Sequence, residues 1–548
     1  MHSTMQDEQL SLATLLEYGT GWHGDATVST WTDAGTRRIT FAELGREAAR
    51  LANGLRSLGI KPGDRVGTFS WNNIEHMTAY AAIPAMGAVL HTVNIRLFAE
   101  QVAFIADHAA DRVMLVDGSL LSQLSAALPG IRTLRHVVVV NGDASALEAP
   151  IGVEVHDYRE LLDAQSDSYP WPDIDERAAA AICYTSGTTG DPKGVVYSHR
   201  SIWLHSQQVT ASYGMDVSPE DTVLPIVPMF HAMSWGIPYG ALMAGSSVVM
   251  PDRFLQPNHL VRLLAEERPT FAAAVPAVWI GVLQQLDAHP QDITHLRHVV
   301  VGGSAVPPSL SRAFSERHGV EIVQAWGMTE ISPLASLAWA PRDTSGDEAW
   351  NYRYTQGRFL PGIRARLVDD EGRLVPPDGE SLGEVEIRSP WTTASYYSPG
   401  STPVGDDKFD DGWLRTGDIG KVTPNGYLTL VDRSKDVIKS GGEWISSVDL
   451  ENEVMAHPDV LEAAAIGIPD EKWDERPLLA VVLREGATVT PDQLRGHLAA
   501  KFAKWQLPER WSFISEVPKT SVGKFDKKVL RARYADGELD VVASVRGD

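Results

Sequence analysis

Residues 184–194 read Tyr-Thr-Ser-Gly-Thr-Thr-Gly-Asp-Pro-Lys-Gly, and they follow an apolar run, residues 181–183, that predicts a buried strand. The segment carries four hydroxyl side chains and three glycines around one lysine, Lys193. Backbone N–H groups, hydroxyl donors and an ammonium group together suit a polyphosphate. The spacing is not that of a Walker A loop, in which the lysine directly follows a glycine. The composition alone fits a surface turn equally well.

Strand and helix alternate on both sides of this loop, from about residue 60 to residue 330. The predicted strands are 65–69, 89–93, 181–184, 247–250, 298–301 and 321–324, and the predicted helices are 73–86, 201–209, 257–267 and 309–318. Asn72 or Asn73 is a suitable cap for the first of these helices. The alternation predicts an α/β fold of parallel sheets covered by helices. Ligands bind at the carboxyl ends of strands in such folds, so the loops after residues 184, 228, 301 and 324 should line a site.

The pattern changes after about residue 360, where the strands become shorter. Strands 383–388 and 426–431 are expected to be antiparallel, and a short polar segment follows at 432–436. An α+β pattern comes next, with helices at 447–457 and 491–505 and strands at 462–468 and 478–484. We therefore predict an N-terminal domain, 1–431, that adds a small antiparallel barrel-like part to its parallel sheets. A hinge at 432–436 and a small mobile domain, 437–548, complete the chain.

Composition and charge narrow the class of protein. The chain has 548 residues and a formal net charge of −23, which argues against a non-specific nucleic-acid binder. The single cysteine, Cys183, permits no internal disulfide and fits a reducing compartment. The first residues lack the pattern of a signal peptide, so a cytoplasmic location is expected. The charge-free stretch 222–251 is long enough to span a bilayer. Prolines and polar residues interrupt it, so we interpret it as core strands and a helix around a pocket, not as a membrane span.

Five motifs occur in order along nearly the whole chain, and together they point to one family. The Lys193 loop resembles the phosphate loop of the adenylate-forming superfamily, which contains acyl-CoA synthetases, luciferases and peptide-synthetase adenylation domains. Residues 326–330, Trp-Gly-Met-Thr-Glu, resemble its adenine-and-magnesium motif, and residues 416–418, Thr-Gly-Asp, resemble its ribose motif. Residues 432–436 resemble its hinge, and residues 518–524 resemble its terminal lysine loop. The chain is identified as a member of this superfamily by these motifs.

The resemblance implies a set of residues that bind ATP. It consists of Thr185, Ser186, Gly187, Thr188, Thr189, Gly190, Lys193, Gly303, Ser304, Ala305, Gln324, Trp326, Gly327, Met328, Thr329, Asp418, Arg433 and Lys524. The implied catalytic residues are Lys193, His231, Thr329, Glu330 and Lys524. Glu330 is expected to hold Mg²⁺, a hard cation that prefers oxygen ligands. Trp326 offers a flat face for adenine, and Asp418 can accept from both ribose hydroxyls.

The resemblance also implies a reaction in two halves. A carboxylate attacks the α-phosphorus of ATP to give an acyl-adenylate and pyrophosphate, and the thiol of coenzyme A then attacks the activated carbonyl. The first half needs positive charge and alignment, whereas the second needs an open path for the thiol. Rotation of the small domain about Lys435 would serve both, with Gly441, Gly442, Glu443 and Trp444 on the coenzyme A side. Two alternatives stay open: a ligase that loads a carrier-protein thiol, and a non-catalytic nucleotide-binding regulator.

The expected acid is apolar. The predicted acid pocket consists of His231, Ala232, Met233, Trp235, Val275, Gly302, Gly303, Met328 and Ser332, with Ala273, Ala274, Pro276, Trp279 and Ile331 as further wall residues. Amino-acid-activating relatives carry an aspartate at the His231 position, so an α-amino acid is disfavoured. Trp235 stands where fatty-acid-activating relatives carry an aromatic gate.

The segments 71–73, 89–94 and 440–446 resemble those of the medium- and long-chain fatty acyl-CoA synthetase branch. A medium- or long-chain fatty acid is therefore the first substrate that we expect. Bulky alicyclic, terpenoid or aromatic acids remain open, because one methylene changes binding by only about 1–3 kcal/mol. Related fatty-acid enzymes often dimerise, so a homodimer stays an option.

Overall fold

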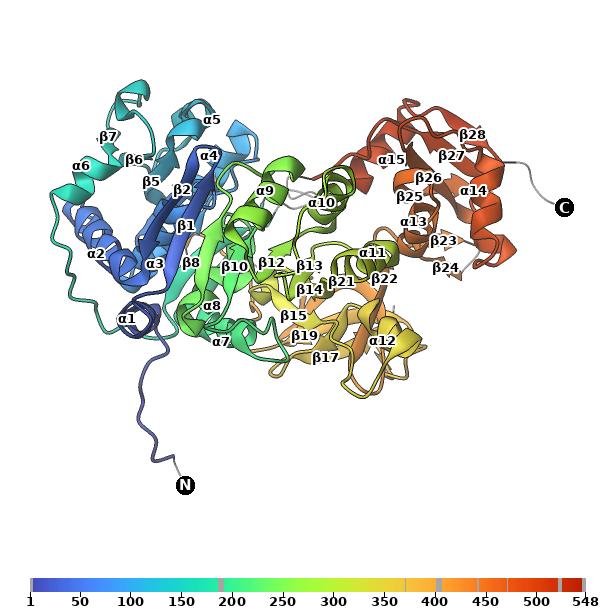
Figure 1. The fold of residues 1–548 in the computed structure, drawn as a ribbon, viewed down its shortest axis with the longest axis horizontal. Coiled ribbons are helices and arrows are strands. Elements are labelled where there is room, and N and C mark those ends of the chain that lie inside the picture. Colours follow the sequence, from blue (N-terminus) through green and yellow to red (C-terminus); the bar gives the residue numbers. More distant parts are fainter. Residues whose placement is uncertain are drawn as a thin grey trace.

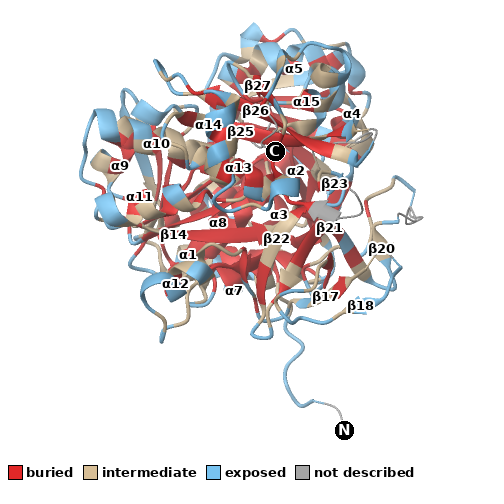
Figure 2. Ribbon diagram, turned by 90° about the vertical axis from the view of Figure 1, so that its right-hand side faces the viewer, coloured by how far each residue is buried: buried red, intermediate tan, exposed pale blue. Residues whose placement is uncertain are grey.

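Three β-sheets organise the molecule (Figure 1). The computed structural model describes residues 3–185, 192–369, 371–400, 407–440, 443–470, 472–520 and 525–544. Two large sheets make up the N-terminal part, and the third forms the small C-terminal part, which lies to one side of the other two. Figure 2 shows that the strands are the most buried parts of the chain, whereas the helices expose their outer faces.

The seven-stranded sheet carries the Lys193 loop at one edge. Its order is β7 (Glu154–Asp157), β6 (His136–Val140), β5 (Asp111–Asp117), β3 (Arg65–Phe69), β4 (Val89–Thr92), β8 (Ala179–Tyr184) and β9 (Gly194–Ser198). The strands are parallel as predicted, except that β9 runs antiparallel to β8. The loop is therefore the connection of a hairpin. The sequence did not predict β9, because only a few residues separate the loop from the following helix.

The fifteen-stranded sheet joins the parallel and antiparallel parts of the chain. Its parallel strands are β1 (Thr27–Thr32), β11 (Ser247–Met250), β10 (Thr222–Pro225), β12 (Phe271–Ala274), β13 (His298–Gly302) and β14 (Glu321–Gly327). Strand β2 (Gly35–Thr40) pairs antiparallel with β1 at one edge. Antiparallel strands continue beyond β14: β15 (Leu334–Leu337), β16 (Gly357–Phe359), β22 (Tyr427–Arg433), β21 (Trp413–Val422), β19 (Gly383–Arg388), β17 (Arg364–Val368) and β18 (Leu374–Val375), with β20 (Phe409–Asp410) on β21.

Helices cover both large sheets. They are α1 (Leu12–Trp22), α2 (Phe41–Ser57), α3 (Ile74–Ala85), α4 (Ala99–Ala109), α5 (Leu121–Ala127), α6 (Tyr158–Asp163), α7 (His199–Thr210), α8 (Ile237–Ala244), α9 (Pro257–Glu267), α10 (Pro276–Ala288), α11 (Pro308–His318) and α12 (Gly346–Arg353). The predicted cap of α3 is confirmed at Asn73, whose side chain accepts from the N–H of His76 at 2.9 Å. Within the described chain, every helix is too short or too polar to span a bilayer.

The C-terminal part is the predicted α+β unit. It contains β23 (Ile438–Ser440), β24 (Glu443–Ile445), β25 (Val460–Asp470), β26 (Asp474–Leu483), β27 (Arg510–Phe513) and β28 (Val541–Ala543), with α13 (Ser447–Met455), α14 (Pro491–Leu498) and α15 (Lys527–Ala535). The prediction of one helix over 491–505 is wrong, because α14 ends at Leu498. Beyond α14 the chain turns, and Phe502 packs against the core that contains Trp511.

Candidate active site

The two ends of the Lys193 loop are held together by backbone hydrogen bonds. The N–H of Thr185 donates to the carbonyl of Lys193 at 2.9 Å, and the N–H of Lys193 donates to Oγ1 of Thr185 at 3.3 Å. Residues 186–191 lie outside the described residues. Phosphate binding therefore stays a prediction for Ser186, Gly187, Thr188, Thr189 and Gly190. The structure does describe Lys193, at the end of the loop.

Tyr396 links this lysine to the predicted magnesium ligand. Lys193 Nζ lies 4.7 Å from the centre of the Tyr396 ring, which is cation–π distance. The Tyr396 hydroxyl donates to Oε1 of the buried Glu330 at 2.7 Å. The three side chains come from the hairpin, from the segment after β19 and from the end of β14. The sequence did not predict Tyr396, since its partners lie far away in the chain.

The segment that presents Glu330 is tightly fixed. The carbonyl of Thr329 accepts from the Tyr197 hydroxyl at 2.6 Å, and the carbonyl of Glu330 accepts from the N–H of Thr393 at 2.8 Å. A Cβ atom at Gly327 would lie 1.9 Å from the carbonyl oxygen of Pro333, so only glycine fits there. Thr329 and Glu330 are both buried. The predicted catalytic pair thus sits on rigid backbone at the carboxyl end of β14.

Asp418 lies between Trp326 and Arg433. The Trp326 indole N–H donates to Asp418 Oδ2 at 2.8 Å, and Arg433 Nε lies 2.8 Å from Oδ1. The Asp418 carboxylate raises the pKa of Arg433, so the guanidinium remains charged. The three predicted ATP residues therefore meet. Trp326 is only 7% exposed, and its ring also meets Phe359 edge-on at 6.3 Å between centroids, so adenine stacking stays a prediction.

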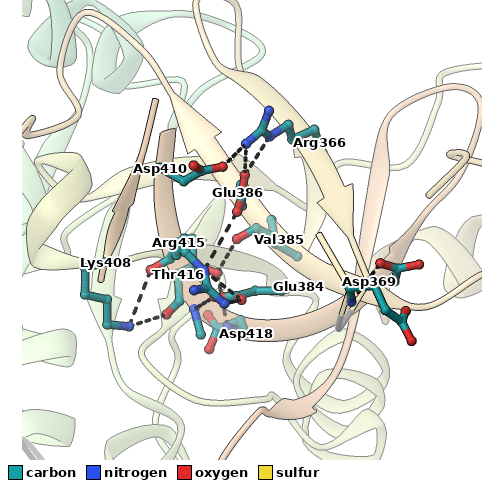
Figure 3. Close-up of polar contacts among 12 residues, drawn as sticks. Arg366, Asp369, Glu384, Val385, Glu386, Lys408, Asp410, Arg415, Thr416 and Asp418 are labelled. Carbon is teal, nitrogen blue, oxygen red and sulfur yellow. Dashed lines mark hydrogen bonds and ion pairs between the residues drawn. The ribbon is translucent and has the colours of Figure 1, made fainter. Parts of the chain in front are cut away.

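A network of charged side chains supports the part of β21 that carries Asp418 (Figure 3). Glu384 accepts from the N–H of Gly417 at 3.0 Å and from the Arg415 guanidinium at 2.6 Å. Lys408 donates to the carbonyls of Arg415 and Thr416 at 3.4 and 3.5 Å. The sequence did not predict Glu384 and Lys408. A charged residue at the edge of a short strand carries no recognisable signal.

Gln324 is a positioning residue in this structure. Its side-chain N–H₂ donates to the carbonyl of Thr355 at 2.6 Å, and its side-chain oxygen accepts from the N–H of Val306 at 2.6 Å. The amide thus anchors the end of the loop that carries Gly303, Ser304 and Ala305. Gly303 has a φ of +90°, a conformation that glycine adopts without strain.

The predicted acid pocket begins with an unusual turn. Four successive non-glycine residues, 232–235, have φ between +44° and +55°, and His231 precedes them. The turn is held by the Ser234 hydroxyl, which donates to the carbonyl of Val227 at 2.8 Å. It brings Trp235 beside Gly302, where an added Cβ would lie 3.4 Å from the indole ring. Ala232, Met233 and Trp235 are buried in one cluster with Ala273, and Val275 packs against it.

Part of the predicted pocket wall is wrong. Ala274 and Trp279 belong to a separate core with Phe314, on the other face of β12 from Ala273. Successive residues of a strand point to opposite faces, so Ala273 and Ala274 cannot line the same pocket. Met328 and Ile331 pack in a third cluster, around Trp326. The hydroxyl of Ser332 donates to the carbonyl of Trp391 at 2.9 Å.

The predicted hinge is tied to the C-terminal part by Asp432. Its carboxylate accepts from the N–H of Ser447, at the start of α13, at 2.9 Å and from the Ser447 hydroxyl at 2.5 Å. Lys527 donates to the same hydroxyl and lies 2.8 Å from Glu451. Burial raises the pKa of Asp432, and the nearby Lys527 opposes this effect. Partial burial of its amine lowers the pKa of Lys435. Gly441, Gly442 and Lys524 lie outside the described residues, and Glu443 and Trp444 begin β24.

Comparisons with known proteins agree with the motifs. The chain matches a family model described as AMP-binding enzyme over residues 20–397, and one described as AMP-binding enzyme C-terminal domain over residues 449–524. It is 45% identical to a long-chain-fatty-acid–CoA ligase of Thermus thermophilus, with 97% of both chains covered. It is 40% identical to a medium-chain-fatty-acid–CoA ligase of Ectopseudomonas oleovorans, with 100% of both covered.

Solved structures give the same result. The anthranilate CoA ligase AuaEII in complex with anthranoyl-AMP superposes with a TM-score of 0.87 at 25% identity, covering 98% of this chain and 100% of the other. ATP-bound MatB from Rhodopseudomonas palustris superposes with a TM-score of 0.80 at 26% identity, covering 96% and 99%. The chain belongs to the AMP-binding enzyme family, as an acyl-CoA synthetase of the adenylate-forming superfamily.

Proposed function

We propose that this protein is an AMP-forming acid–CoA ligase. It joins a carboxylic acid to the α-phosphate of ATP with release of pyrophosphate, and then transfers the acyl group to coenzyme A with release of AMP. The observation that carries this proposal is that two groups of predicted ATP-site residues each come together in the fold. Lys193 and Glu330, joined by Tyr396, form one group, and Trp326, Asp418 and Arg433 form the other. Relatives that match over nearly their whole length are named as CoA ligases.

The residues around Glu330 fit Mg²⁺. Mg²⁺ binds through one or two carboxylates together with substrate phosphates and water, and Glu330 is a buried carboxylate whose orientation is set by Tyr396. The ion would neutralise charge on the polyphosphate. Lys193 would add a fixed positive charge from the hairpin, and Asp418 would accept hydrogen bonds from the ribose. We infer that Lys524 supplies a further cation during adenylation only, when the small domain faces the site.

The acid is inferred to have an apolar tail. The side chains that the turn at 232–235 gathers around Trp235 are apolar, and such walls favour an uncharged substrate tail. The relatives named above act on long-chain and medium-chain fatty acids, and a 40% identical relative from Ruegeria pomeroyi is named 3-methylmercaptopropionyl-CoA ligase. A medium- or long-chain fatty acid is therefore the first substrate to test.

The decisive experiment is ATP–pyrophosphate exchange with a panel of acids, followed by detection of AMP and thioester. The panel should contain straight-chain fatty acids of increasing length, a methylthioalkanoate, an alicyclic acid and an aromatic acid. We expect exchange with an apolar acid and thioester formation with coenzyme A. If the acyl group were transferred only to a carrier-protein thiol, coenzyme A would not be the acceptor. Absence of exchange with every acid would refute the ligase activity.

A further inference from the structure

Three metal-binding side chains meet at an edge of the seven-stranded sheet, away from the site above. His136 is the first residue of β6, and Glu154 and His156 are the first and third residues of the edge strand β7. The parallel register pairs His136 with Glu154. Alternate residues of a strand share a face, so all three side chains project from the same face of the sheet.

The spacing of their donor atoms matches the first shell of a zinc ion. Nδ1 of His136 lies 3.1 Å from Nε2 of His156 and 3.6 Å from Oε2 of Glu154, and the last two atoms are 3.8 Å apart. A point equally distant from these three atoms lies about 2.0 Å from each, which is the usual length of zinc–nitrogen and zinc–oxygen bonds. We propose that His136, Glu154 and His156 form a zinc-binding site, with water as the fourth ligand.

The chemistry of the donors selects the metal. Two imidazole nitrogens and one carboxylate suit Zn²⁺ and related transition metals, whereas Mg²⁺ and Ca²⁺ prefer oxygen ligands. Ligation requires the imidazoles to be neutral.

The surroundings allow an ion to enter. The side chains of His136 and His156 are 18% and 24% exposed, whereas that of Glu154 is 71% exposed, so the site opens to solvent on the glutamate side. The short distance between the two imidazoles also fits a direct hydrogen bond between them. That bond does not account for the Glu154 carboxylate beside both rings, whereas a zinc ion would bind all three groups.

The position predicts a structural role. The three residues lie at the amino ends of β6 and β7, whereas the Lys193 loop follows the carboxyl end of the parallel strand β8. Bound zinc would fasten the four-residue edge strand β7 to β6. An ion that binds only the folded state stabilises it, so zinc should raise the unfolding temperature without being needed for adenylate formation.

The test is zinc titration of the full chain against a chromophoric chelator, with the wild type, H136Q/H156Q, E154Q and the surface control H289Q. We expect the wild type and H289Q to bind one more zinc equivalent than H136Q/H156Q. E154Q should bind that equivalent more weakly than the wild type, because it removes the carboxylate ligand. Cobalt in place of zinc should give visible d–d absorption that the double variant lacks.

Circular dichroism and ATP–pyrophosphate exchange should be unchanged in H136Q/H156Q, which separates loss of the site from loss of the fold. Equal zinc stoichiometry and affinity in the wild type and in the double variant would overturn the proposal, as would absence of zinc uptake by the wild type.

Discussion

Tyr396 contacts both Lys193 and Glu330, and the two contacts can be tested separately. Tyr396→Phe removes the hydrogen bond to Glu330 but keeps the ring under Lys193. A hydrogen bond to a charged group contributes about 1.5–3 kcal/mol. We therefore expect the rate of adenylate formation to fall about 10-fold or more, as measured by ATP–pyrophosphate exchange.

Tyr397→Phe is the matched control, because the neighbouring tyrosine hydroxyl does not contact Glu330. It should retain the exchange rate of the wild type. Tyr396→Leu removes the ring as well and should be slower than Tyr396→Phe. Equal rates for Tyr396→Phe and the wild type would show that the Glu330 contact does not support catalysis.

Asp252 predicts a pH dependence of stability. Burial, and then the carboxylate of Asp117, raise its pKa to about 6. The unfolded value is near 3.8, so the folded state binds more protons between about pH 4 and pH 6. The folded state therefore loses stability as pH rises through this window. Asp252→Asn should raise the free energy of unfolding by about 1–2 kcal/mol at pH 7–8, with no gain near pH 4.

Urea unfolding followed by tryptophan fluorescence at several pH values measures this difference. Asn also tolerates the left-handed backbone at this position, where φ is +49°. The exposed Asp25→Asn serves as the control and should show no such pH-dependent gain. A constant difference between Asp252→Asn and the wild type at all pH values would contradict the assignment.

Among the individual site residues, those that lie within a short sequence motif were predicted. Those that connect one motif to another through side-chain contacts were not. Glu330, Asp418 and Arg433 were found because each lies in a short recognisable pattern. Tyr396 and Glu384 were not found, since their partners lie on strands that only the fold brings together. Trp326 was found, but its hydrogen bond to Asp418 could not be predicted from a tryptophan alone.

The turn at 232–235 has a strained backbone, because four successive non-glycine residues adopt left-handed φ angles. Left-handed backbone costs about 1–2 kcal/mol for each non-glycine residue, so the surroundings must hold it. Asn72 does so from the other large sheet: its amide donates to the carbonyls of Pro225 and Val227 at 2.8 and 2.9 Å and accepts from the N–H of Met229 at 2.8 Å. One buried side chain thus fixes the segment that leads into the turn.

Asn72→Ala should therefore affect both stability and the acid site. It removes three hydrogen bonds to backbone groups, so the free energy of unfolding should fall by about 2–4 kcal/mol, and KM for the acid should rise. Asn73→Ala is the matched control. It removes the cap of α3, which costs about 1 kcal/mol, and should leave KM for the acid unchanged. An unchanged KM in Asn72→Ala would show that the turn keeps its shape without the clamp.

The strands and helices themselves were largely predictable, but their partners were not. Periodicity located β3, α3, α9 and β13 to within a residue or two. It could not show that the antiparallel strands from β15 onward extend the parallel sheet, because strand pairing joins segments far apart in sequence. The packing of Phe502 against the core, beyond the early end of α14, is also a tertiary effect.

At the scale of the whole molecule, the two half-reactions should respond differently to Lys524. Lys524→Ala removes the cation that we propose for adenylation only. We expect ATP–pyrophosphate exchange to lose most of its rate, while supplied acyl-AMP is still converted to thioester. The exposed Lys528→Ala, in the same segment, should keep both activities. Equal loss of both halves in Lys524→Ala would refute alternation of the small domain.

The joint formed by Asp432 has a consequence for protein engineering. The Asp432 carboxylate accepts from Ser447, and Ser447 is backed by Lys527 and Glu451. The Ser446 hydroxyl also donates to the carbonyl of Val431 at 2.7 Å, and Arg531 lies 2.7 Å from Asp436. In a chimaera, the small domain of a relative should be able to replace this one after Asp432. The relative's domain should carry serine, glutamate and lysine at the positions of Ser447, Glu451 and Lys527.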